Sequence, residues 1–135
     1  MKQTFETDSI LFSLMKTAFA SSGITGGVYS INRPLNSAKE DVVVNTITLS
    51  QEFYPQIGTS NINIHVQDMV VMIGGVQQIM PNAGRLKALS TIALDAIRLA
   101  NPAGLSIAVE FQTVVEEAEI KQHYANIRIS WSIHN

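Results

Sequence analysis

The sequence of 135 residues contains no cysteine. This absence excludes a disulfide scaffold, a thiolate metal site and a cysteine nucleophile. The chain is also poor in charge, because only 15% of its residues are Asp, Glu, Lys or Arg and its formal net charge is −2. A disordered charged tail would need many charges and few apolar residues. A general nucleic-acid binder would need a basic stripe, so we expect no nucleic-acid recognition.

Long hydrophobic runs and catalytic signatures are missing as well. The longest uncharged apolar segment, Met69 to Gly84, is interrupted by glycine, proline and amide residues, so we expect no membrane contact through a spanning helix. Glu6 and Asp8 precede any apolar stretch, and we therefore expect no signal peptide. Phosphate-loop, zinc-protease and serine-hydrolase motifs do not occur. We expect a protein that is not an enzyme and that holds no cofactor and no metal.

The residues that are present predict one α+β domain over 1–135. Apolar residues at helical spacing predict one helix that begins near Thr7–Ser9 and ends at Ser21–Gly23, and another over about 82–100. The expected sheet is mixed and mostly antiparallel, with about four to five strands and both helices packed on one face. The segments expected to form strands are 28–31, 42–49, 61–68, 105–112 and 124–133, with a turn region over 53–60 and a hairpin connection over 114–122.

The last strand alternates between apolar and polar residues over its whole length. Such a period of two is typical of a sheet with one buried and one polar face. If the alternation continues through the hairpin, Glu110 should lie opposite Tyr124 or Asn126, with Arg128 one diagonal step away. A pairing that breaks this register would indicate a bulge.

Few side chains suggest chemistry. His65, His123 and His134 lack the spacing of a zinc site, and we expect them to be exposed or to lie in an interface. The acidic segment 116–119 has too few oxygen ligands for a calcium loop and is expected to be a solvated turn. Arg33 is expected to form a surface ion pair with Glu40 or Asp41.

Two surfaces are unusual for a monomer. The segment Met69–Met80 is strongly apolar, and it forms either a strand or hairpin that continues the sheet into the core or an arm that packs on a neighbouring subunit. The polar sheet face carries amides and hydroxyls where Lys and Glu are usual, and it is either solvated or part of an interface. The residues expected to contact another subunit or a partner are Met69, Val71, Met72, Ile73, Val76, Ile79, Met80, Asn61, Asn63, His65, Gln67, Asn126 and Arg128.

The order of the elements resembles that of the tail-terminator, or tail-completion, proteins of long-tailed phages. The resemblance covers nearly the whole chain: a helix, a short strand before Asn32-Arg33-Pro34, an apolar strand, the alternating strand with Ile62 and Val66, a helix after Pro81, and a hairpin ending in 125–133. It is a similarity of pattern, and it transfers no individual functional residue.

The resemblance implies a structural virion protein that catalyses nothing. Such a protein forms a ring, usually of six copies, that caps the tail tube and offers the surface that joins the head. The implied partners are other copies of the chain, the tail tube protein and a head connector or neck protein. The implied location is the head-proximal end of the virion tail, and the host cytoplasm during assembly. A small homo-oligomeric ligand-binding or enzyme domain, with His65, Tyr124 or Arg128 converging in a pocket, is the alternative.

Overall fold

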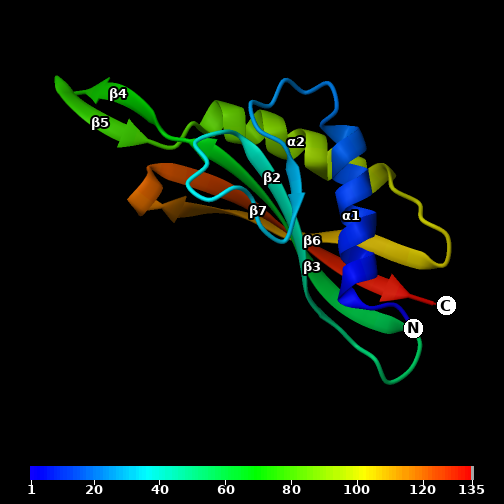
Figure 1. Cartoon of the computed structure of the whole chain (residues 1–135). Coiled ribbons are helices and arrows are strands. Elements are labelled where there is room, and N and C mark those ends of the chain that lie inside the picture. Colours follow the sequence, from blue (N-terminus) through cyan, green and yellow to red (C-terminus); the bar gives the residue numbers. More distant parts are fainter. Residues whose placement is uncertain (135) are drawn as a thin grey trace.

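In the computed structural model, which describes residues 1–134, two helices pack on one face of a five-stranded sheet, and a separate two-stranded sheet projects from the body (Figure 1). This arrangement confirms the α+β fold. The elements in chain order are α1 (Thr4–Ala18), β1 (Val28–Ser30), β2 (Asp41–Leu49), β3 (Gln56–Gln67), β4 (Met69–Ile73), β5 (Val76–Met80), α2 (Ala83–Leu99), β6 (Leu105–Glu117), a short 3₁₀ turn (Ala118–Ile120) and β7 (Gln122–Ile133).

The main sheet has the strand order β1-β2-β3-β7-β6. Only the pairing of β1 with β2 is parallel, and the other pairings are antiparallel. A parallel pair needs a crossover, and residues 31–40 provide it. The three-residue β1 and the thirteen-residue β6 are the edges of the sheet, so β6 carries the longer open backbone edge.

The core lies between the helices and the alternating apolar residues of the sheet. Trp131 is 2% exposed, and its indole Nε1 donates a hydrogen bond of 2.8 Å to the Ser60 hydroxyl. That hydroxyl lies 2.7 Å from the Thr46 hydroxyl, which lies 2.6 Å from the Thr7 hydroxyl of α1. Buried polar groups are stable when they are paired, and this chain of hydroxyls fixes α1 on the sheet.

Both helices exist, but the boundaries expected for α1 are wrong. It begins at Thr4, because Gln3 and Glu6 form a reciprocal capping box one turn before the expected start. It ends at Ala18, although Gly23 does adopt the left-handed φ of 77°. The second helix matches its expected bounds closely, and the Asn82 side chain caps it by accepting from the Arg85 amide.

The C-terminal hairpin differs from its expected form in length and in register. β6 continues through Glu117, so only 118–121 connect the strands, and the expected connection over 114–122 is wrong. Val109 pairs with Ile129, but the next pair joins Phe111 to Arg128, and Glu110 is therefore the extra residue of a bulge. Tyr124 and Asn126 lie opposite Val115 and Thr113, not opposite Glu110.

The turn region expected over 53–60 is also shorter than predicted. β3 begins at Gln56, whose buried side chain donates to the carbonyl oxygens of Lys2 and Ser50. Gly58 lets β3 pass close to β2 here, since a side chain at this position would collide with Leu49 and with the Thr48 carbonyl.

Gly26 provides a test of the packing at the β1–β2 crossover. An added methyl group would overlap the Asp41 carboxylate and the Glu40 carbonyl, so Gly26→Ala should lower the free energy of unfolding by about 1–3 kcal/mol, the usual cost of overpacking. Gly84→Ala is the matched control, because its methyl group meets nothing within 4 Å and it lies in α2. Urea unfolding should show the control equal to the parent or more stable by about 0.5–1 kcal/mol. Equal stability of both variants would contradict the packing described here.

Candidate functional site

The segment Met69–Met80 is a β-hairpin that projects away from the body, and we call it the arm (Figure 1). Gly74 and Gly75 form its turn with φ values of 58° and 79°, the pattern of a two-residue hairpin turn. Every side chain of its two strands is exposed except Val71, which is half-buried. Of the two alternatives for this segment, the one in which it continues the main sheet into the core is therefore wrong, because the segment forms a separate hairpin.

Both faces of the arm are apolar. One face carries Met69, Val71, Ile73, Val76, Gln78 and Met80, and the other carries Val70, Met72, Gln77 and Ile79. Met72 is 67% exposed and Val76 is 61% exposed. An isolated two-stranded hairpin is only marginally stable in water, and exposed apolar patches of this kind mark interaction surfaces. The arm is thus the strongest candidate for a contact with another protein.

The base of the arm is held by polar bonds to the β6–β7 turn and to the first residues of β7. The Asp68 carboxylate, whose side chain is 6% exposed, lies 2.6 Å from Nδ1 of His123. The Asp68 amide also donates to the Lys121 carbonyl over 3.0 Å. On the other side, Pro81 and the helix cap Asn82 follow the arm directly. These bonds fix the point at which the arm leaves the body.

The polar face of the sheet contains a cluster of amides. The Asn126 side chain donates hydrogen bonds to the side-chain oxygens of Asn61 and Asn63, at 3.1 and 2.7 Å. Gln67 lies at the end of β3 and is exposed. Arg128 lies over the Phe111 ring, 5.3 Å from its centroid, which is a cation–π geometry. The residues expected to form this face therefore do share it, and the amides bond one another across three neighbouring positions.

One end of the polar face is covered by the crossover loop 31–40. Asp41, which is 1% exposed, accepts from the Gly27 amide, from Arg33 at 3.2 Å and from the Ser37 hydroxyl at 2.6 Å. Arg33 also donates to the Gln122 side chain over 2.7 Å. The ion pair expected for Arg33 is thus made with Asp41, but it is buried, because the loop folds back over the sheet.

Glu40, the other expected partner of Arg33, pairs with Arg85 of α2. The guanidinium donates twice to the carboxylate, at 2.6 and 2.8 Å. The hydrogen bonds from Arg85 lower the pKa of Glu40, and the same bonds raise the pKa of Arg85. This bidentate pair ties the crossover loop to the first turn of α2, next to the base of the arm.

His65 lies under the same loop, and the expectation that it is exposed is wrong. It is 8% exposed, and its Nδ1 lies 2.8 Å from a Glu117 oxygen. Burial lowers the pKa of His65, and the nearby Arg33 charge lowers it further, although Glu117 acts in the opposite direction. Loss of hydration is the dominant cause, so the folded chain favours the neutral imidazole.

The side chains of the alternative ligand site are only partly brought together. The rings of His65 and Tyr124 lie 5.0 Å apart, but Arg128 is directed to Phe111. A hollow of about 350 Å³ lies between the crossover loop and the polar face, and His65, Asn63 and Glu117 line it with the loop residues. Glu117 was expected to be a solvated turn residue, and it is instead the partner of His65.

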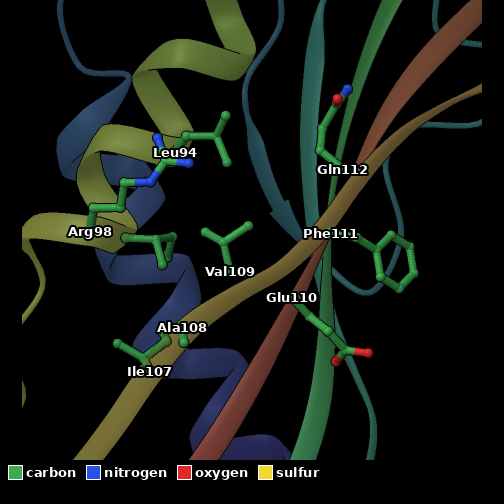
Figure 2. Close-up of a pocket in the computed structure, with 9 residues that line it drawn as sticks. Leu94, Arg98, Ile107, Ala108, Val109, Glu110, Phe111 and Gln112 are labelled. Carbon is green, nitrogen blue, oxygen red and sulfur yellow. The ribbon is translucent and has the colours of Figure 1, made fainter.

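A groove between α2 and β6 was missed by the sequence analysis. One hollow of about 490 Å³ lies between Leu94 and Arg98 of α2 and residues 107–112 of β6. Figure 2 shows Val109 between the strand and the helix, whereas Glu110 and Phe111 point away from the helix. A second hollow of about 520 Å³ shares Leu94 and Gln112 with the first and extends toward Pro81. We call the two together the α2–β6 groove.

The described residues show neither a metal-binding cluster nor a membrane-spanning helix. Over residues 1–134, no group of three or more acidic or histidine side chains is arranged to hold a metal ion. No helix in the same range is long and apolar enough to cross a membrane. No protein-family model matches the chain, and a comparison with curated proteins finds none that is significantly similar.

His65 should make the stability depend on pH. Because its pKa is lower in the folded chain than the ordinary value of about 6.5, the unfolded chain binds more protons just below that value. The free energy of unfolding should therefore fall between pH 7.5 and 5.5, by no more than about 1.4 kcal/mol per pH unit. His65→Gln should flatten this dependence in urea titrations at the two pH values. His134→Gln, which alters an exposed histidine, should leave it intact; an unchanged slope in His65→Gln would refute the assignment.

Proposed function

We propose that this protein is a structural assembly protein of a long-tailed phage, which caps the tail tube as a ring of its own copies and offers the surface that joins the head. The observation that carries the proposal is the arm, whose apolar faces are not covered by any other part of residues 1–134. The pattern of elements that resembles tail-terminator proteins supports the same conclusion. On this proposal the protein acts by binding and catalyses no reaction.

A ring is expected because the two surfaces that meet in the proposed contact are different. The arm is a projecting hairpin, and no second arm of the same kind occurs within residues 1–134. A contact between an arm and a different patch on the next copy is heterologous, and it closes into a ring when the rotation between copies allows it. The tail tube protein and a head connector or neck protein would contact the two ends of such a ring.

The location follows from this role. During assembly the protein would be in the host cytoplasm, and in the virion it would lie at the head-proximal end of the tail. The low charge of the chain, 15% of residues, agrees with surfaces that are covered in the working assembly, because ions are costly to desolvate.

The arm provides the test. Val70 and Ile79 are cross-strand partners, and Val70→Thr with Ile79→Thr keeps β-branched residues in the hairpin while it removes apolar surface. The double variant should self-associate at least about tenfold more weakly, or about 1.4 kcal/mol, with an unchanged melting temperature. Light scattering after size exclusion and negative-stain microscopy would measure the loss of rings.

Ile57→Thr is the matched control, because Ile57 is also an exposed β-branched strand residue, at 65%. It should leave the rings and their number of copies unchanged. Addition of the parent protein to polymerising tail tubes of the phage that encodes it should limit tube length. A parent protein that stays monomeric at every concentration and does not bind tubes would overturn the proposal.

A further inference from the structure

Both faces of the arm expose apolar side chains that no other part of residues 1–134 covers. Its strands pair only with each other, and its twelve residues include no charge. The surface that receives it must therefore be elongated and uncharged at its floor. The outer backbone edges of β4 and β5 also carry N–H and C=O groups that no other strand of the described chain pairs.

The part of the α2–β6 groove nearest Pro81 has these properties, whereas Arg98 and Glu110 are among the residues that line the other part. The part nearest Pro81 is lined by Leu86, Ser90 and Leu94 of α2 and by Gln112 and Val114 of β6. Val114 is 48% exposed although it lies beside the helix. Among the described residues, the only charged side chain that lines this part of the groove is that of Lys87, which is exposed. A charged segment seated here would lose hydration at the floor, whereas an uncharged apolar hairpin would not.

The β6 wall of the groove also offers backbone groups that no strand of the described residues pairs. β6 is the edge strand, and its outer backbone edge is open along the groove. An incoming strand can pair with this open edge, because an extended chain added to a sheet edge bonds through its backbone.

We propose that the arm of one copy occupies the α2–β6 groove of the next copy. The inference rests on the proposed self-assembly and names its receiving surface. Residues 1–134 of each copy form one arm and one such groove, so in a closed ring every arm can bind a groove and every groove can hold an arm. The groove begins at Pro81, directly after the arm of the same chain. In a ring, each copy would insert its arm into one neighbour and receive the arm of the other neighbour beside its own.

A chain's own arm is a poor occupant of its own groove. The arm continues outward from the start of α2, away from the body (Figure 1). The bonds of Asp68 to His123 and Lys121 hold its base in that direction. Occupation by a second copy therefore needs no refolding of the body.

Two neighbouring valines give a matched test. Val114 lines the groove, whereas Val115 pairs with Tyr124 on the opposite face of the sheet, and both are exposed. Val114→Lys should weaken self-association at least tenfold in size exclusion with light scattering, and Val115→Lys should leave it unchanged. Circular dichroism and melting curves of both variants should match the parent, which shows that the loss is not a loss of fold. Equal effects of the two substitutions would overturn the proposal.

Cross-linking locates the contact directly, because the parent chain has no cysteine. Gln78→Cys on the arm and Thr91→Cys in the groove, mixed as separate chains with a short bismaleimide, should give a heterodimer whose linked peptides mass spectrometry identifies. Thr17→Cys, exposed on α1, replaces Thr91→Cys in the control mixture and should give none.

The outcomes separate this inference from the proposed function. If rings form normally and the only links join two copies of the Gln78→Cys variant, arms pair with each other. That result would overturn the groove assignment but not the proposed ring. Rings with no link from Gln78→Cys to Thr91→Cys would overturn the groove assignment as well. A monomeric parent chain would overturn both proposals.

Discussion

The buried carboxylate of Asp41 is the constraint on which one whole end of the structure depends. A buried charge is costly unless it is paired and hydrogen-bonded, and Asp41 obtains its donors from Gly27, Arg33 and Ser37. Arg33 and Ser37 belong to the crossover loop, and Gly27 directly precedes β1. The loop must therefore fold over the sheet, and in doing so it brings Arg33 to Gln122 at the start of β7.

The arm depends on this rigid end without being part of it. Arg33 also approaches Glu117, the partner of His65, so the crossover loop contacts the end of β6 as well. The β6–β7 turn that follows holds Asp68 at the base of the arm. Segments with few buried contacts are the least stable parts of a fold, and the arm is such a segment. A firm base limits the directions in which it points and so lowers the entropy that a partner must remove on binding.

Much of the fold could be predicted because the pattern of the sequence is local and regular. Ile62, Ile64 and Val66 alternate with polar residues, and this period was enough to place their strand and its buried face. The bulge at Glu110 could not be predicted, since one inserted residue shifts the register without altering the apolar pattern around it. The burial of Arg33 was missed for a different reason: its partner Gln122 lies 89 residues away.

Neither the position of the arm nor the presence of the groove could be predicted from the sequence. A hairpin that is apolar on both faces has the composition of a fully buried strand, so the sequence left its position open. The α2–β6 groove leaves no local signal, because its walls come from Leu94 and Val114, which belong to different elements. Surfaces made by distant segments become visible only when the sheet order is known.

The pairing of Met69 with Met80 has a consequence for how such a chain changes over evolution. Both ends of the arm leave the body at one point, between β3 and α2, so insertions or deletions there do not alter the main sheet. Adding one residue to each strand would lengthen the arm by about 3.4 Å and reverse the faces at its tip, whereas adding two would restore them. The reach of the protein and the architecture of its body are therefore free to vary separately.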